Sequence, residues 1–162
     1  MATRLTADMK RVVTEQRLAF VATVCPDGTP NLSPKGTIAV WDDEHLVFAD
    51  LRSPGTMANL KKNPAVEINV VDPFVRKGYR FKGKGQAIVD GTLFEEIARF
   101  YRSRWVDTGK NMEPLIRGFV LVKVETALPL ISPAYDDGAS DELSIRKQWA
   151  SYFAGLNKPR AE

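Results

Sequence analysis

Alternation of apolar and polar positions dominates the first ninety residues and predicts β-strands. The segments 18–24, 46–50, 66–71 and 78–90 alternate or are rich in β-branched and aromatic residues, which is typical of strands with one buried face. The Asp27–Gly28 pair follows the first of these segments and favours a tight hairpin turn. The pattern therefore predicts consecutive antiparallel strands.

The strand that returns from this hairpin, within residues 30–40, contains Pro34 and Gly36. Proline cannot donate a hydrogen bond to a neighbouring strand, and glycine weakens a strand. We therefore expect this strand to be broken or kinked at these two positions. Such an irregularity marks a place where the backbone can approach another group closely.

Four segments change to the helical period. Residues 6–16 have this spacing, with Thr6 as a possible N-terminal cap. A second, short helix is expected between Arg52 and Asn63–Pro64, which would end it. Residues 92–105 and 141–156 carry apolar stripes at helical spacing. With a further strand at 119–128, the chain has about six strands and flanking helices. We expect an α+β, mainly β fold in one domain, 1–162, whose antiparallel sheet curls into a barrel and so hides its edges.

Composition narrows the function classes. The 162 residues are 44% hydrophobic and 27% charged, which suits a single globular domain. Apolar runs stay well below the ~20 residues of a membrane span and the start lacks a secretory signal core, so a cytoplasmic protein is expected. The single cysteine, Cys25, and single histidine, His45, predict neither a disulfide nor a metal site. The net charge of +3 suits an anionic ligand.

Three stretches rich in basic and small residues are candidates for that ligand: 33–37, 52–59 and 80–85. The second begins a helix, where free backbone N–H groups favour an anion such as phosphate. The three stretches would converge on one anion if they lie on neighbouring strands of a barrel. The alternative is that their charges are solvated and protect sheet edges.

Arg80, Lys82 and Lys84 alternate with other residues, so the three cations share one face of their strand. A platform for single-stranded nucleic acid would place aromatic rings among such cations. Tyr79 and Phe81 instead face the other way, so nucleic acid is not the expected partner. The sequence also has no nucleophile elbow and no Cys–His pair. We predict no catalytic side chain; in an enzyme a cofactor would supply the reactivity.

Three segments read together resemble the pyridoxamine 5'-phosphate oxidase-like, FMN-binding split-barrel superfamily: "LAFVATVCPDGTPNLSPKG", "LVFADLRSPGTMANLKKNPAVEINVV" and "GYRFKGKGQAIVDG". The resemblance covers roughly residues 18–91. It implies a split β-barrel that forms a homodimer, with two FMN molecules in the clefts between the subunits.

The resemblance also implies a set of cofactor-binding residues. In the family, the strand beside the flavin corresponds to Lys35–Thr37, the phosphate turn to "LRSPGTMANL", and a strand crossing the flavin to "YRFKGKG". The implied residues are Ser33, Lys35, Gly36, Thr37, Ala49, Asp50, Arg52, Ser53, Thr56, Asn59, Arg80 and Lys82. Arg52, Ser53 and Thr56 would hold the phosphate.

The chain departs from a true pyridoxamine 5'-phosphate oxidase at two places. Gly55–Thr56 stands where these oxidases often have an Arg–Lys pair, and the C-terminus lacks their tryptophan and arginine motif. A vitamin B6 substrate is therefore not expected. The chain looks more like the short bacterial flavin-nucleotide-binding relatives, with a helical C-terminal elaboration at about 132–157.

We therefore expect an FMN-dependent oxidoreductase whose substrate is unassigned, with NAD(P)H or a small molecule as possible electron donor. Two alternatives stay open. One is a flavin carrier or redox sensor without turnover. The other is a reductase that binds a deazaflavin in the same cleft.

Overall fold

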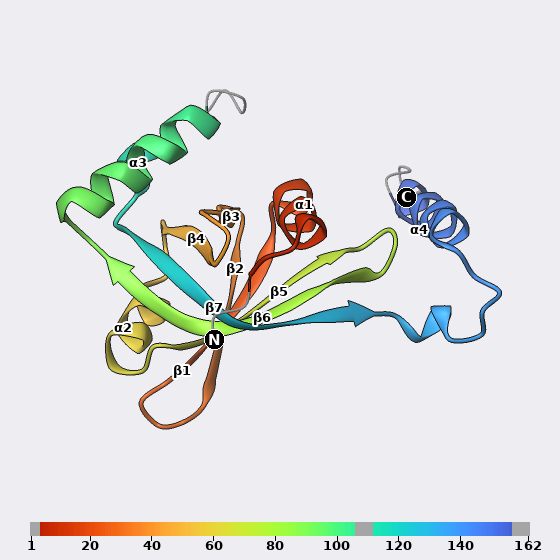
Figure 1. Ribbon diagram of the computed structural model, residues 1–162, viewed down its shortest axis with the longest axis horizontal. Helices are drawn as coiled ribbons and strands as arrows, with labels where there is room; N and C mark the ends of the chain where they lie inside the picture. The colour runs from red at the N-terminus through yellow and green to blue at the C-terminus, as the bar shows by residue number, and fades with distance from the viewer. Residues whose placement is uncertain (1–3, 106–111, 157–162) are drawn as a thin grey trace, which may run out of the picture.

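The computed structural model describes residues 4–105 and 112–156, and its centre is a curled antiparallel sheet (Figure 1). Seven strands lie in the order β2-β1-β5-β6-β7-β4-β3. Their bounds are β1 Ala19–Val24, β2 Pro30–Lys35, β3 Ala39–Val40, β4 His45–Asp50, β5 Ala65–Asp72, β6 Lys77–Ile88 and β7 Gly118–Ile131. The arrangement confirms the predicted α+β split-barrel type of fold.

Four α-helices surround the sheet: α1 Ala7–Gln16, α2 Pro54–Lys62, α3 Gly91–Trp105 and α4 Glu142–Leu156. Two short 3₁₀ turns, η2 Glu113–Leu115 and η3 Pro133–Tyr135, flank β7. Helix α1 starts where its cap was predicted, because the Thr6 hydroxyl accepts a hydrogen bond from the Met9 N–H at 3.2 Å. None of the helices in this described part of the chain is long and apolar enough to cross a membrane.

The β1–β2 hairpin and the break at Gly36 follow the predicted pattern, whereas no break occurs at Pro34, which lies within β2. Gly28 in the turn has φ +84°, a left-handed conformation that glycine adopts without strain. The returning strand ends as β2 at Lys35 and resumes as β3 at Ala39, so the sheet has seven strands where about six were expected. Pro34 pairs with Phe20 of β1, and β2 is an edge of the sheet, where proline is tolerated.

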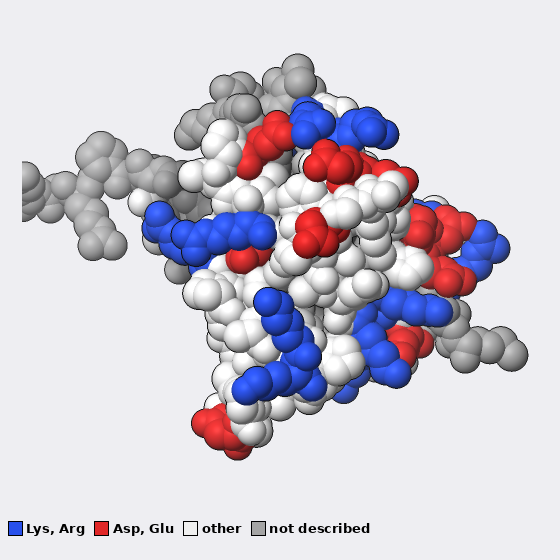
Figure 2. Space-filling model, turned by 90° about the vertical axis from the view of Figure 1, so that its left-hand side faces the viewer, with Lys and Arg blue, Asp and Glu red and all other residues white. Residues whose placement is uncertain are grey.

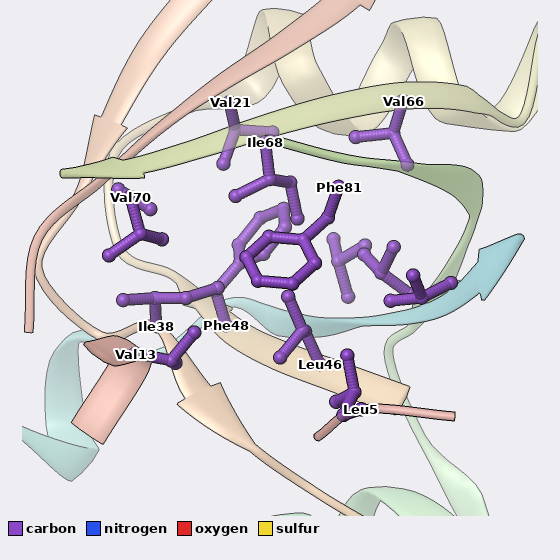
Figure 3. Packing of buried hydrophobic residues seen from close by; sticks show 14 of the residues in the cluster. Leu5, Val13, Val21, Ile38, Leu46, Phe48, Val66, Ile68, Val70 and Phe81 are labelled. Atoms are coloured by element: carbon purple, nitrogen blue, oxygen red, sulfur yellow. The ribbon is translucent and has the colours of Figure 1, made fainter. Parts of the chain in front are cut away.

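Two apolar clusters hold the fold together. Inside the barrel, Phe48 and Phe81 face each other among Leu46 and Ile68, all at most 1% exposed (Figure 3). Outside the barrel, α3 packs on β4 and β7 and encloses residues such as Ile97. The sheet is therefore covered on both faces near the ends of β4 and β7, which makes that region rigid.

The chain after residue 131 leaves the sheet and ends in α4, on the side opposite to α3 (Figure 1). Helix α4 rests on the tip of the β5–β6 hairpin. The Arg76 guanidinium lies 3.5 Å from the centre of the Trp149 ring, and Arg146 pairs with Asp72 at 2.9 Å. Ile145 is the buried residue of α4.

Candidate functional site

A cavity of about 550 Å³ lies where β2 and β4 end and α2 begins. Its lining comes from two segments that are distant in the sequence, 33–37 and 49–53, together with a residue of the loop before η2. The lining residues are Ser33, Pro34, Lys35, Gly36, Thr37, Ala49, Leu51, Arg52, Ser53 and Met112. The structure thus brings together two of the three stretches that the sequence singled out.

Thr37 joins the two walls of this cavity. Its hydroxyl accepts a hydrogen bond from the Ala49 N–H at 2.9 Å and lies 3.3 Å from the Ala49 carbonyl oxygen. The Thr37 carbonyl oxygen in turn accepts a hydrogen bond of 2.6 Å from the Tyr101 hydroxyl of α3. Burial raises the pKa of Tyr101 far above its usual value, so the hydroxyl stays protonated and donates. The backbone wall at 36–37 is therefore fixed from two sides.

Lys35 is a buried cation in the lining, with only 5% of its surface exposed. Its Nζ donates to the Ser33 hydroxyl at 2.6 Å and lies 5.7 Å from the centre of the Phe48 ring. Burial lowers the pKa of Lys35, and the charge of Asp50 partly opposes this effect. An anion in the cavity would add to the negative charge that Asp50 already provides near the buried amine.

The N-terminal end of α2 is not free to bind an anion at Ser53. The Asp50 carboxylate, 4% exposed, accepts hydrogen bonds from the Ser53 N–H at 2.8 Å and the Ser53 hydroxyl at 2.7 Å. Asp50 thereby fills the place that an incoming anion would take at Ser53. Arg52 is exposed and lines the cavity, so Arg52 and Lys35 are the two cations that face it.

Thr56 and Asn59 lie under α2 rather than in the cavity lining. Both are buried, at 1% and 5% exposed. The Asn31 side-chain amide donates to the Thr56 hydroxyl at 3.3 Å, and the Asn59 amide donates to the Thr23 hydroxyl at 3.1 Å. In this chain the pair fastens α2 to β1 and β2, and any contact with a cofactor stays a prediction.

Arg80 and Lys82 lie on the outer face of β6, away from this cavity. Arg80 Nε is 3.1 Å and Lys82 Nζ is 3.3 Å from the carboxylate of Glu67 on β5. Opposite these side chains, Phe81 points into the barrel, as predicted. Of the twelve predicted cofactor-binding residues, seven line the cavity: Ser33, Lys35, Gly36, Thr37, Ala49, Arg52 and Ser53.

Sequence reasoning missed Leu51, Met112 and the anchoring role of Tyr101. Tyr101 belongs to the apolar stripe of α3, so its spacing predicts a core residue. The spacing does not predict which group its hydroxyl binds. Met112 belongs to a part of the sequence that carries no hydrophobic pattern. Among the described residues, the lining holds no carboxylate, imidazole or thiol, and no group of three metal-ligating side chains occurs in residues 4–105 and 112–156.

The model of the family named pyridoxamine 5'-phosphate oxidase matches residues 5–128, which is most of the chain. The chain belongs to the pyridoxamine 5'-phosphate oxidase family. The match contains both walls of the cavity and ends before η3 and α4. The C-terminal segment therefore lies outside the part that the family model describes.

The chain is similar to several proteins of known structure. HupZ of Group A Streptococcus is 29% identical, with a TM-score of 0.68 over 79% of this chain and 95% of HupZ. An FMN-binding protein of Syntrophomonas wolfei is 16% identical, with a TM-score of 0.60 over 75% of this chain and 82% of its own. An F420 reductase is 22% identical, with a TM-score of 0.59 over 76% of this chain and 98% of its own. No curated protein matches the chain significantly.

Proposed function

We propose that this protein binds FMN in the 550 Å³ cavity and works as an FMN-dependent oxidoreductase. The observation that carries the proposal is the pair Lys35 and Arg52 at a cavity whose described lining contains no carboxylate. Asp50 lies behind this lining and is engaged by Ser53, so a phosphate-bearing cofactor would supply further negative charge to the two cations. The family membership and the likeness to a protein named FMN-binding support the same cofactor.

The residues present fit such a cofactor. Arg52 and Lys35 would hold the phosphate, with the Ser33 hydroxyl beside the lysine amine at 2.6 Å. A Cβ added at Gly36 would meet only the Arg17 carbonyl oxygen, at 3.9 Å, so the backbone at this wall leaves room for a ligand to come close. The apolar side chains of Leu51 and Met112 would exclude water from the part of the ligand that they cover.

Bound FMN supplies the hydride and electron transfer that protein side chains cannot perform. The chain's own residues bind and orient it. Lys35 and Arg52 place positive charge in the cavity, and the Tyr101–Thr37–Ala49 hydrogen bonds keep its two walls at a fixed separation. Within the described lining, no residue is positioned as an acid or base, so we assign no catalytic side chain.

We also propose a homodimer with the flavin at the subunit interface. The outer face of the sheet is open and partly apolar: Phe20 is 48%, Leu32 65% and Leu128 48% exposed. Arg80 and Lys82 belong to the same face, because Arg80 pairs in register with Leu128. A second copy on this face would bury the apolar residues and bring both cations toward the partner's cavity. Such a dimer would act in the cytoplasm.

Two other functions fit the same cavity. The likeness to an F420 reductase supports a deazaflavin as the ligand, because a deazaflavin cofactor also carries negative charge. A carrier or redox sensor would bind the flavin but would not pass electrons to a substrate.

The deciding experiment is a visible absorption spectrum of the purified protein after incubation with FMN, followed by anaerobic NAD(P)H. Stoichiometric flavin bands with bleaching by NAD(P)H are expected for the oxidoreductase. Bands without bleaching by any donor would favour the carrier. Preference for a deazaflavin would identify the reductase, and failure to retain either cofactor would overturn the proposal.

A further inference from the structure

A second cavity, of about 490 Å³, lies on the outer face of the sheet over β4, β7 and β6, next to the end of α2. Its polar lining consists of His45, Lys61, Lys84, Gln86 and Lys123. On β4, His45 lines this cavity and Ala49 lines the first, so at about 3.3 Å per residue the two cavities lie roughly 13 Å apart along that strand. No residue lines both.

Three of the basic residues form a row across adjacent strands. His45 of β4 is the register partner of Lys123 on β7, and Lys123 is the partner of Lys84 on β6. Lys84 and Lys123 are directly opposed on one face, and like charges in that position destabilise a sheet. Protection of a sheet edge does not explain the row, because the edges of this sheet are β2 and β3.

Acidic side chains of the protein neutralise only part of the positive charge around this cavity. Lys84 lies 3.5 Å from Glu125, with both side chains about half exposed or more, and His45 lies 2.8 Å from Asp42. Within residues 4–105 and 112–156, neither Lys61 nor Lys123 has an ion pair, and no acidic side chain lines the cavity. Figure 2 shows the side of the molecule that carries α2 and α3, where Lys and Arg side chains are interspersed with Asp and Glu side chains and with uncharged surface.

The rest of the lining is apolar. Leu60 and Pro64 come from α2 and the turn after it, and Ala87 and Leu121 come from β6 and β7. A volume of this size suits a small organic ligand. Single-stranded nucleic acid would instead require stacking aromatic rings, and the described lining contains none apart from the His45 imidazole.

We propose that this second cavity binds a small organic phosphate of about nucleotide size, independently of the flavin. Lys61, Lys84 and Lys123 take its phosphate groups, since lysine amines bind phosphate as point charges. Leu60 and Leu121 contact its organic part. The proposal does not depend on the identity of the ligand in the first cavity.

Calorimetric titration of the full chain with ADP at low salt tests the site, with inorganic pyrophosphate and a single-stranded oligonucleotide in parallel. Lys123→Glu should weaken ADP binding about ten- to hundredfold, because it replaces a charge-assisted contact by repulsion. Lys147→Glu on α4 makes the same change of net charge outside the cavity and is the matched control. Arg52→Ala, in the first cavity, should bind ADP as the unchanged protein does.

ADP binding that is tighter than pyrophosphate binding and is lost only in Lys123→Glu would support the proposal. Equal weakening by Lys123→Glu and Lys147→Glu would mean a general charge effect and would overturn it. Loss of ADP binding in Arg52→Ala would place ADP in the first cavity and also overturn it. Strong binding of the oligonucleotide with none of ADP would identify a nucleic-acid surface instead.

Discussion

The first and the second cavity differ in how firmly the fold holds their lining residues. The first is lined by residues that the fold fixes: Lys35 is buried, and Thr37 is tied to both Ala49 and Tyr101. The second is lined by long, exposed lysine side chains on β6, β7 and the end of α2. A fixed site loses little conformational entropy when it binds, whereas mobile lysines must be ordered by the ligand. The first cavity therefore suits a resident cofactor, and the second suits a ligand that comes and goes.

The second cavity still has one rigid component, the backbone beneath it. A Cβ at Gly83 would lie 1.9 Å from the Lys123 carbonyl oxygen, at the irregularity between Lys82 and Gly83 where β6 shifts against β7. We expect Gly83→Ala to lower the free energy of unfolding by about 3 kcal/mol, since two strands must separate. Urea denaturation measures this. Gly155→Ala, where an added Cβ meets nothing within 4 Å, should be neutral or slightly stabilising; equal effects would contradict the close contact.

Arg52→Ala tests the first cavity directly. If Arg52 makes a charge-assisted bond to the FMN phosphate, its loss should weaken FMN binding by about 1.5–3 kcal/mol and leave the fold intact. Fluorescence titration of FMN gives the dissociation constant, with Lys147→Ala as a neutral control. An unchanged constant would remove Arg52 from the site.

Tyr101→Phe tests whether the fixed walls matter for binding. The substitution removes the donor to the Thr37 carbonyl oxygen and should lower the free energy of unfolding by about 1–2 kcal/mol. Because the Thr37 wall loosens, FMN should also dissociate faster. Tyr152→Phe removes a hydroxyl from a residue that is 55% exposed and should change neither quantity. If Tyr101→Phe lowers the free energy of unfolding but leaves the FMN dissociation rate unchanged, Tyr101 is a purely structural residue.

The smallest expected effect is a pH dependence that arises from Lys35. Burial lowers the pKa of this amine in the folded protein, so the unfolded chain holds the proton more tightly. The stability of the FMN-free protein should therefore rise as the pH increases from the lowered pKa toward 10.5, the ordinary value for lysine. Urea denaturation at several pH values should show this rise in the parent protein and less of it in Lys35→Met. Parallel curves for the two would show that Lys35 does not titrate in this range.

Local signals in the sequence predicted most of the fold. The Thr6 cap, the Asp27–Gly28 turn and the break at Gly36 each depend on a few neighbouring residues, and the structure confirms all three. The expected convergence of three stretches on one cavity is confirmed for 33–37 and for the start of 52–59, but not for 80–85. Strands β2 and β4 are not neighbours in the sheet, so the curl of the sheet and not strand adjacency brings the two segments together.

The electrostatic details of the site depend on partners that sequence spacing does not reveal. Arg80 and Lys82 pair with Glu67 because of the register between β5 and β6. The Asp50 carboxylate accepts a hydrogen bond from the Ser53 N–H because the chain turns sharply after β4. The basic row that includes Lys123 appears only when three strands are aligned; of its members, only Lys84 belongs to a stretch that the sequence singled out.

Pro34 has a consequence for how copies of this protein can associate. It lies in β2, at the edge of the sheet, where it offers no N–H to a further strand. A neighbouring molecule therefore cannot extend the sheet strand by strand past this point, and the growth of continuous β-fibrils from this edge is hindered. Pro34 therefore protects this edge of the folded protein against edge-to-edge aggregation.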